Sequence, residues 1–323
     1  MNIAFGPVPS RRLGRSLGIN NIPPKSCSYS CLYCQVGATK GQKITPQAFY
    51  TPEEILQQVG EQLKKVDSTI EAVDYLTFVP DGEPTLDINL GKTIELLRPL
   101  NIPIAVITNA SLLWNEDVRA VISKADWVSL KVDSAIEPIW KRINRPHEGL
   151  RLNEVLNGIQ LFAQEFQGKL VTETMLLHGV NDNDENISGI SNFIHKIGVS
   201  RSYLAIPTRP TAESGICAAN ETTLNRCYQI MAAVIPHVEY LIGYEGDAFA
   251  FTGDIRHDLL GITAVHPLRE SAVNKLLGQA KADWSLIEDL IAERNLKEVK
   301  YLGERYFVRC FSNKDDEKQR LEI

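Results

Sequence analysis

Three of the six cysteines in this 323-residue chain fall on one short segment, at Cys27, Cys31 and Cys34. The other three are scattered, at Cys217, Cys227 and Cys310. In a reducing compartment, a group of closely spaced cysteines more often binds metal or takes part in catalysis than forms disulfides. The C-x3-C-x2-C spacing therefore points first to metal chemistry.

Four thiolates normally hold a cubane iron–sulfur cluster, and three on one loop can hold three of its corners. The fourth iron then lacks a protein ligand and can bind a substrate or cofactor, like the open position of a catalytic metal site. Zinc is the rival metal, but a structural zinc site needs four ligands, and His147 and Cys217 are distant in the sequence. Free or disulfide-bonded cysteines are the remaining alternative. The spacing favours the three-cysteine cluster.

Short apolar runs alternate with amphipathic stretches, which predicts a parallel α/β sheet buried under helices. The expected strands are Ser16–Ile22, Tyr75–Val79, Pro103–Thr108, Trp127–Asp133, Leu170–Leu177 and Ser202–Ile206. The expected helices are Pro52–Lys65, Ile88–Leu97, Glu116–Lys124, Asn153–Glu165, Glu185–Ile197 and Glu221–Val234. Thr51 is a typical N-cap for the first helix, with Pro52 at its first position. Six units are too few for the usual eight-stranded barrel and favour a partial (β/α)6 barrel, with a doubly wound sheet as the alternative.

In either architecture the chemistry lies at the C-terminal ends of the strands. Polar residues follow the expected strands at these ends: Asp81-Gly82-Glu83-Pro84, Thr108-Asn109, Lys131 and Asp133, His178, and Thr208-Arg209. By itself, Asp81–Pro84 would be interpreted as a solvated turn. Because it follows the second strand behind the cysteine segment, we interpret it as part of the site. For His178 a structural loop position and a site position remain equally open.

The expected strand Trp127–Asp133 has two chemically distinct faces, because alternate side chains of a strand point to opposite sides. Val128, Leu130 and Val132 form an apolar face suited to the helices, whereas Ser129, Lys131 and Asp133 form a polar face suited to the lumen. An internal Lys131–Asp133 ion pair is the alternative to a ligand-binding role. In the next strand Glu173 and Met175 share one face, and the sequence leaves open whether that face looks inward.

The pattern changes after about residue 255. Two short helices are expected at Arg269–Gln279 and Asp283–Glu293, then two strands at Lys297–Lys300 and Arg305–Arg309 joined at Leu302-Gly303. We therefore expect a barrel over residues 1–250 and a small winged-helix-like C-terminal domain over 251–323. Residues 256–323 carry twelve basic and twelve acidic side chains, so DNA binding is not assumed.

Composition narrows the class of protein. With 44% hydrophobic and 23% charged residues the chain is ordinary for a globular protein, which excludes wholly disordered, collagen-like and coiled-coil classes. No apolar run approaches the roughly 18 residues of a membrane helix, and the N-terminus has no secretory pattern, so we expect a cytoplasmic protein.

The charge is unevenly distributed along the chain. The net charge of −6 argues weakly against general nucleic-acid binding, yet residues 1–52 hold six basic and no acidic side chains. This segment is either a solvated loop region or a positive mouth that attracts an anionic substrate or an electron donor.

The cysteine segment, with Tyr33 just before its last cysteine, resembles the signature of the radical S-adenosylmethionine (SAM) superfamily. The resemblance implies a partial (β/α)6 barrel with the cluster loop after the first strand. It also implies a [4Fe-4S] cluster, held by the three cysteines, whose free iron chelates the amino and carboxylate groups of SAM. Tyr33 then matches the residue that packs near the adenine.

Further positions match the family's SAM contacts. Asp81-Gly82-Glu83 resembles the Gly-Gly-Glu-like turn that binds the methionine amino group, with Asp in place of the first Gly. Ser129 and Asp133 resemble the ribose contacts. Lys131 is expected to meet a carboxylate of SAM or of the substrate, and Asn109 belongs to the same expected cofactor-binding set.

A closer resemblance, to the branch of wyosine-type tRNA-modifying enzymes, rests on three segments: 5–18, 129–134 and 204–210. Some members of that branch carry a second three-cysteine cluster. The remaining cysteines of this chain show no cluster spacing, which makes a second cluster, and with it the wyosine reaction, doubtful.

The resemblance implies an enzyme that cleaves SAM reductively to a 5′-deoxyadenosyl radical, which abstracts hydrogen from a substrate. A low-potential electron donor, flavodoxin or ferredoxin, is then needed, and Arg11, Arg12 and Arg15 are candidates to dock that donor or an RNA phosphate. The leading hypothesis is modification of a tRNA base. The alternatives are modification of a protein or peptide recognised by the C-terminal domain, and a non-catalytic zinc or iron–sulfur binding module.

Overall fold

The computed structural model describes residues 3–39, 41–67, 72–243, 246–247 and 249–310. Its centre is an eight-stranded sheet whose strands lie side by side in chain order. The strands are β1 (Ala4–Ser10), β2 (Gly14–Ile19), β3 (Tyr75–Phe78), β4 (Ile104–Thr108), β5 (Trp127–Lys131), β6 (Lys169–Met175), β7 (Arg201–Ala205) and β8 (Val238–Leu241). Strand β1 is antiparallel to β2, and β2 to β8 are parallel. Because the strand order never reverses, the sheet is a partial TIM-like barrel and not a doubly wound sheet.

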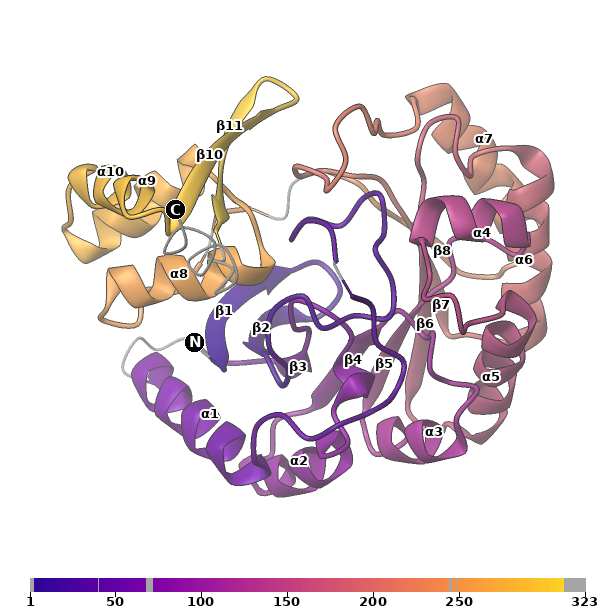
Figure 1. Ribbon diagram of the computed structural model, residues 1–323, viewed down its shortest axis with the longest axis horizontal. Helices are drawn as coiled ribbons and strands as arrows, with labels where there is room; N and C mark the ends of the chain where they lie inside the picture. The colour runs from indigo at the N-terminus through magenta and orange to yellow at the C-terminus, as the bar shows by residue number, and fades with distance from the viewer. Residues whose placement is uncertain (1–2, 40, 68–71, 244–245, 248, 311–323) are drawn as a thin grey trace, which may run out of the picture.

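Helices cover the outer face of the curved sheet (Figure 1). They are α1 (Pro52–Asp67), α2 (Leu90–Leu97), α3 (Glu116–Ile122), α4 (Glu137–Asn144), α5 (Leu152–Glu165), α6 (Asp184–Ile197) and α7 (Glu221–Ala232), with short 3-10 helices at Pro84–Leu86 and Arg98–Leu100. The predicted start of α1 is confirmed: Thr51 Oγ1 accepts the Glu54 N–H, and Glu54 Oε2 accepts the Thr51 N–H at 2.8 Å. This reciprocal pair is a capping box.

All six expected strands form, with ends that differ by a few residues, and the sequence analysis missed β1 and β8. Strand β1 contains Pro7 and Pro9, which argue against a central strand because proline donates no ladder hydrogen bond. The structure places β1 at an edge of the sheet, where proline is tolerated. Strand β8 is a four-residue strand at the other edge.

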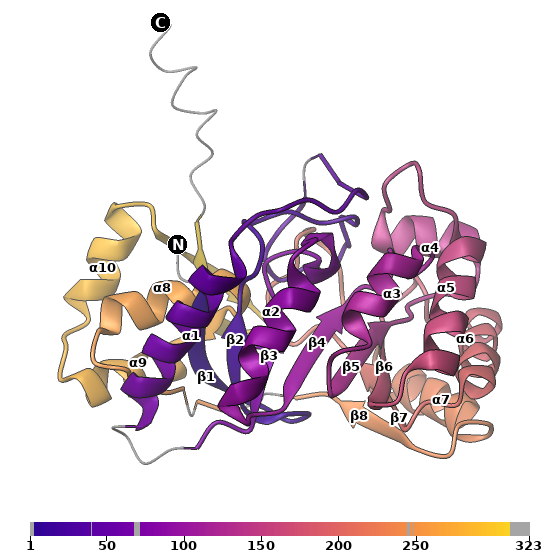
Figure 2. The same ribbon diagram turned by 90° about the horizontal axis from the view of Figure 1, so that it is seen from below.

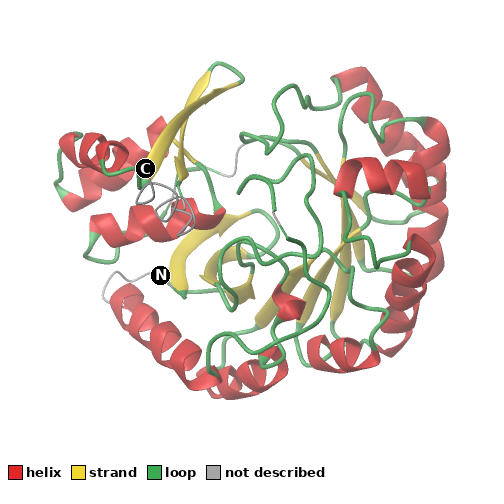
Figure 3. Ribbon diagram, viewed as in Figure 1, coloured by secondary structure: helices red, strands yellow, loops and turns green. Residues whose placement is uncertain are grey.

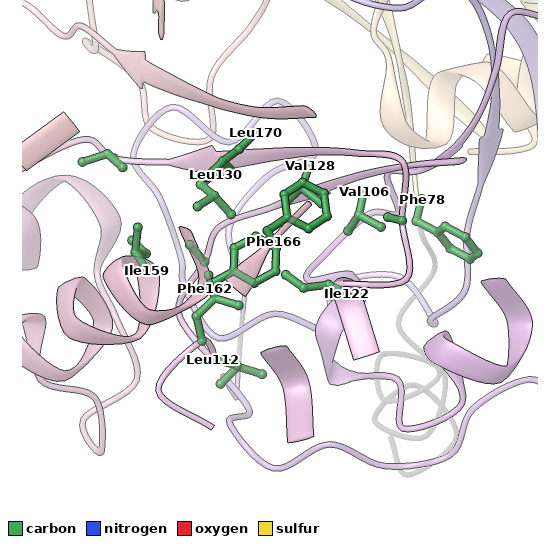
Figure 4. Packing of buried hydrophobic residues seen from close by; sticks show 14 of the residues in the cluster. Phe78, Val106, Leu112, Ile122, Val128, Leu130, Ile159, Phe162, Phe166 and Leu170 are labelled. Carbon is green, nitrogen blue, oxygen red and sulfur yellow. The ribbon is translucent and has the colours of Figure 1, made fainter. Parts of the chain in front are cut away.

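The core has two layers, one on each face of the sheet. Val128, Leu130 and Val132 belong to the cluster between sheet and helices, whereas Trp127 belongs to the cluster inside the lumen, so the predicted faces of β5 are confirmed. Figure 4 shows part of the outer layer, where Val128 and Leu130 lie near α3 and α5. In β6 the inward residues are Val171, Glu173 and Met175, which settles the face that the sequence left open.

The C-terminal part packs around an apolar cluster of its own. Its elements are α8 (Ile255–Val265), β9 (Leu268–Arg269), α9 (Glu270–Ala280), α10 (Ser285–Ala292), β10 (Leu296–Tyr301) and β11 (Glu304–Arg309), with strand order β10-β11-β9. The two expected helices and the hairpin are confirmed, and the hairpin turns at Leu302 and Gly303, both with positive φ. Helix α8 was not expected, because Gly261 and the β-branched residues after it have low helix propensity.

Helix α8 lies against β1, which joins the C-terminal part to the edge of the barrel (Figures 1 and 2). The division of the chain at residue 250 stays a prediction, and residues 311–323 of the expected domain lie outside the described residues. Figure 3 shows the eight-stranded sheet as one curved layer with helices along its outer side, and the C-terminal strands apart from it. Among the described residues, no helix has the length and apolarity to cross a membrane.

Two helical glycines give a matched test of this packing. A Cβ on Gly158 of α5 would lie 2.3 Å from the backbone of Leu113 and Trp114, whereas one on Gly60 of α1 would meet nothing within 4 Å. We expect Gly158→Ala to destabilise the fold by about 1–3 kcal/mol through overpacking. Gly60→Ala should stabilise it by about 0.5–1 kcal/mol. Denaturant unfolding measures both, and equal effects of the two substitutions would contradict this account of α5.

Candidate functional site

A cavity of about 330 Å³ lies at the C-terminal ends of the parallel strands. All three clustered cysteines line it, together with residues that follow β3, β4 and β7. A cavity of this size falls in the range of small-molecule sites. The ends of β3, β4, β5 and β7 that the sequence singled out therefore converge on the cavity of the cysteine loop, whereas His178 after β6 does not.

The loop that carries the cysteines is held by the turn after β3. Ser26 pairs with Gly82 in an isolated bridge, and the Glu83 N–H donates to Ser26 O at 2.9 Å. A Cβ on Gly82 would lie 2.0 Å from Ser26 O, so only glycine allows this approach. The Asp81–Pro84 turn is therefore a packed support of the loop and not a solvated turn.

Burial sets the protonation state of the three thiols. Burial raises the pKa of Cys27 well above its ordinary value, and raises that of Cys31 to about 12. Burial also raises the pKa of Cys34, an effect opposed by the nearby Lys25 ammonium. The thiols are thus neutral when no metal is bound, and because iron binds thiolates, loading must release protons.

The donor set fits an iron–sulfur cluster. The side-chain amides of Asn109 and Asn144 lie 3.5 Å from Cys27 Sγ and 3.4 Å from Cys31 Sγ, and N–H donors to sulfur are typical of such clusters. In the described part of the chain, no three His, Cys, Asp or Glu side chains form a group suited to a single metal ion. A cubane holds each thiolate on a different iron, so its ligands lie farther apart than those of one zinc ion.

Asp81 is a buried carboxylate that faces the cavity. It is 4% exposed, and neither of its oxygens has a hydrogen-bond partner in the described structure. Lys25 Nζ lies 3.4 Å from Asp81 Oδ1, and burial raises the pKa of Asp81 to about 6 despite this ammonium. An unsatisfied buried acceptor carries a free-energy cost that a bound N–H donor would relieve.

Glu83 and Asp133 were expected to contact SAM, but their carboxylates accept hydrogen bonds from other residues of the protein. Glu83 is 1% exposed and accepts from Thr85, from the Thr108 hydroxyl at 2.6 Å and from the Asn109 N–H at 2.7 Å. Neither carboxylate lines the cavity, and neither does Ser129, which is 1% exposed. Glu83 and Asp133 therefore support the residues that line the cavity.

Asp133 positions the wall of the cavity. Its carboxylate accepts from the Tyr33 hydroxyl, from Asn144 Nδ2 at 2.8 Å and from the Met175 N–H at 2.9 Å. Tyr33 does line the cavity, and so do Asp81, Gly82, Asn109 and Lys131. Of the expected cofactor-binding set, five residues therefore line the cavity, and Glu83 and Asp133 hold residues that line it.

The alternative of a Lys131–Asp133 ion pair is wrong, because Lys131 pairs with Glu173. Arg12 pairs with the other oxygen of Glu173, and Lys131 Nζ also lies 5.3 Å from the centroid of the Tyr33 ring. The sequence analysis missed this cluster of charges. The available signal was Glu173 itself, a charged residue between Val171 and Met175 on an otherwise apolar strand face.

Two arginines of the first segment, Arg11 and Arg12, line the cavity. The Arg12 side chain is 13% exposed and turns into the cavity, and Arg11 donates to Ile242 O beyond β8. His178 does not line the cavity; its Nδ1 lies 3.5 Å from Asp182 Oδ2, and the side chain is largely exposed.

The C-terminal part contributes to the cavity wall through Val265 and His266. His266 contacts Arg209, which also donates to Gln35 Oε1 at 3.0 Å, next to Cys34. The Tyr306 hydroxyl donates to Thr208 O at 2.9 Å. The segment after β7 thus links the C-terminal hairpin to the cysteine loop.

Comparison with known proteins agrees with this site. Residues 21–188 match the Radical SAM superfamily. The chain is 43% identical over 317 residues to the UPF0026 protein MJ1312 of Methanocaldococcus jannaschii, and the match covers 98% of each chain. It is 21% identical over 234 residues to a tRNA-2-methylthio-N(6)-dimethylallyladenosine synthase of Vibrio vulnificus, covering 68% of this chain and 48% of that protein.

A solved radical SAM methyltransferase from Sphaerobacter thermophilus has the same fold, with a TM-score of 0.54 at 18% identity over 71% of this chain and 67% of that one. The chain belongs to the radical SAM superfamily and, within it, to the UPF0026 proteins. Superfamily members are enzymes, they need a reductant, and their cofactors, a [4Fe-4S] cluster and SAM, are those of this chain.

Replacement of one ligand tests the metal site. We expect anaerobically prepared protein to be brown and to hold about four irons, and Cys31→Ala to lose them because only two thiolates remain. Cys217→Ala, at an exposed cysteine outside the cavity, is the matched control and should keep full iron content. Colourless wild-type protein with bound zinc would contradict the cluster and support a metal-binding module.

Proposed function

We propose that Cys27, Cys31 and Cys34 hold the cluster and that this chain is a SAM-cleaving enzyme that modifies a tRNA base. The observation that supports the first part is the convergence of the three partly buried cysteines and the Asp81–Gly82 turn on one cavity. When bound, the cluster supplies the electron that cleaves SAM to a 5′-deoxyadenosyl radical.

The chain's own residues bind and orient SAM in this proposal. Asp81, whose oxygens accept no hydrogen bond in the described structure and whose Oδ1 lies 3.4 Å from the Lys25 ammonium, accepts N–H groups of the methionine amino group. Tyr33, held by Asp133, provides a flat wall for the adenine. Lys131 offers its ammonium to a carboxylate, in exchange for part of its contact with Glu173.

The remaining residues exclude water from the reaction. The cavity lining is mostly apolar and includes Leu13, Met175, Ile206, Leu241 and Val265. A primary carbon radical reacts with whatever is near, so an apolar lining keeps it available for the substrate. We propose flavodoxin or ferredoxin as the electron donor.

The charge of the cavity supports an anionic substrate. Among the described lining residues, four side chains are basic and two are acidic: Arg11, Arg12, Lys131 and Arg209 against Asp81 and Glu173. SAM itself carries a net positive charge, since its sulfonium and ammonium groups outnumber its carboxylate. A positive lining is therefore better matched by a phosphate-bearing substrate such as RNA. The tRNA-modifying relative of Vibrio vulnificus supports the same class.

A peptide substrate is the second candidate. The observation that favours it is the C-terminal part, which has a balanced charge and places His266 in the cavity wall. A winged-helix-like part in this position would present a polypeptide, rather than a phosphate backbone, to the site.

The catalytic proposal is tested by SAM cleavage. Loaded protein with dithionite and SAM should release 5′-deoxyadenosine. Cys31→Ala should release none, while Cys217→Ala should match the wild type. Chromatographic quantification of the nucleoside provides the measurement, and no release from fully loaded wild-type protein would overturn the proposal.

The substrate class is tested by binding. We expect loaded protein to retain discrete species from a total tRNA pool, and Arg209→Gln to weaken this retention by roughly tenfold, about 1.4 kcal/mol. Arg256→Gln, whose side chain pairs with Glu293 away from the cavity, is the control. Retention of peptides and not tRNA, identified by mass spectrometry, would replace the RNA proposal with the peptide one.

A further inference from the structure

Beyond the ligands themselves, we propose that two side-chain amides, Asn109 and Asn144, set the reduction potential of the cluster. Two buried carboxylates, Glu83 and Asp133, act as positioning residues that hold these amides on the sulfurs. The inference rests on the proposed cluster site, and it concerns how readily that site accepts an electron rather than whether it forms.

Asn144, the last residue of α4, is directed at Cys31. Its Nδ2 lies 3.4 Å from Cys31 Sγ and 2.8 Å from Asp133 Oδ2. A carboxylate only accepts hydrogen bonds, so this contact fixes which end of the amide faces inward and leaves the second N–H for the sulfur. Asn144 is 2% exposed, so no solvent competes for that N–H.

Asn109, which follows β4, is directed at Cys27 in the same way. Its Oδ1 accepts the Ser111 N–H at 2.9 Å, which turns Nδ2 toward Cys27 Sγ at 3.5 Å and Ser28 Oγ at 2.9 Å. Glu83 Oε2 accepts the backbone N–H of Asn109 at 2.7 Å. The turn that supports the cysteine loop therefore also fixes the amide that contacts its first sulfur.

The sulfur of Cys34 has hydrogen-bond donors of a different origin. The backbone N–H groups of Val36 and Gly37 point to Cys34 and lower its pKa, against the larger effect of burial. Its donors belong to the cysteine loop itself, so they form wherever that loop forms. The amides on Cys27 and Cys31 come from the ends of β4 and α4 and depend on tertiary structure.

The expected effect follows from charge. One-electron reduction adds a negative charge to the cluster and its thiolates, and N–H donors stabilise the more negative state. The effect is strong in a buried site, where water does not screen it. Both amides should therefore raise the reduction potential and bring the cluster within reach of a biological donor.

The experiment is a spectroelectrochemical titration of loaded protein without SAM, with iron content measured in parallel. We expect Asn144→Leu and Asn109→Leu each to shift the reduction equilibrium about tenfold toward the oxidised cluster. For a one-electron couple this is a potential lower by about 59 mV. Because the two amides contact different sulfurs, the double variant should show about the sum of both shifts.

The matched control is Asn21→Leu. Asn21 is completely buried and donates to Pro84 O and Asp87 Oδ2, but it contacts no cysteine sulfur. It should cost comparable stability and leave the potential unchanged. In Asp133→Asn the lost negative charge raises the potential while the lost orientation of Asn144 lowers it, so the positioning role is tested as a cycle: Asn144→Leu should shift the potential less in the Asp133→Asn background than in the wild type.

The outcomes separate the two proposals. Loaded variants with an unchanged potential would overturn this inference and leave the proposed function intact, and so would an equal shift in the Asn21 control. If Asn144→Leu loses iron, Asn144→Ser is titrated in its place, and loss of iron from both would show a role in cluster retention instead. Failure of the wild-type protein to bind iron would contradict the proposed function itself.

Discussion

The site depends on one close backbone contact, between the cysteine loop and the turn after β3. Ser26 O accepts the Glu83 N–H, and the space between Ser26 and Gly82 is too small for a side chain. A short loop without regular structure pays a large entropy cost to hold three side chains in one geometry. Pairing with a turn that is itself fixed at a strand end lowers that cost, because the sheet provides the rigidity.

Buried carboxylates extend this support from the backbone to the side chains. Glu83 accepts hydrogen bonds from residues that follow β3 and end β4. Asp133 accepts hydrogen bonds from the cysteine loop, α4 and β6. Each has its oxygens satisfied, which is the condition under which burial of a carboxylate is tolerated. Asp81 differs, since its oxygens lack such partners and face the cavity. Asp81 is therefore suited to bind a ligand, whereas Glu83 and Asp133 stabilise the protein around the site.

Residues from both ends of the chain contribute to the cavity wall. Arg12, from the β1–β2 turn, reaches Glu173 in the lumen, and His266, after α8, forms part of the opposite wall. The Glu173 carboxylate between Lys131 and Arg12 leaves this part of the lumen with a net positive charge. Burial makes that charge costly unless a ligand compensates it, so the same groups that complete the barrel also bias the site toward anions.

Local sequence was sufficient for the metal chemistry and the repeating architecture. The spacing of Cys27, Cys31 and Cys34 is a local feature, and the period-two pattern of β5 depends only on which side chains share a face. The strand ends followed from local rules as well, because parallel strands bring their C-terminal ends together, whereas the role of Tyr33 came only from the family resemblance. Edge strand β1 escaped prediction because its prolines are acceptable only at an edge, which is a property of the assembled sheet.

Only the tertiary structure decided which buried charged side chains pair with one another. Lys131 pairs with Glu173 rather than Asp133, and Glu83 and Asp133 support the site without lining it. Such choices depend on which residues from distant segments share a buried space, and a charged side chain takes whichever partner satisfies it there. The roles of Arg12, Asn144 and His266 are of the same kind. Each lies far in sequence from the group that it contacts, so no spacing or periodicity in the chain could reveal it.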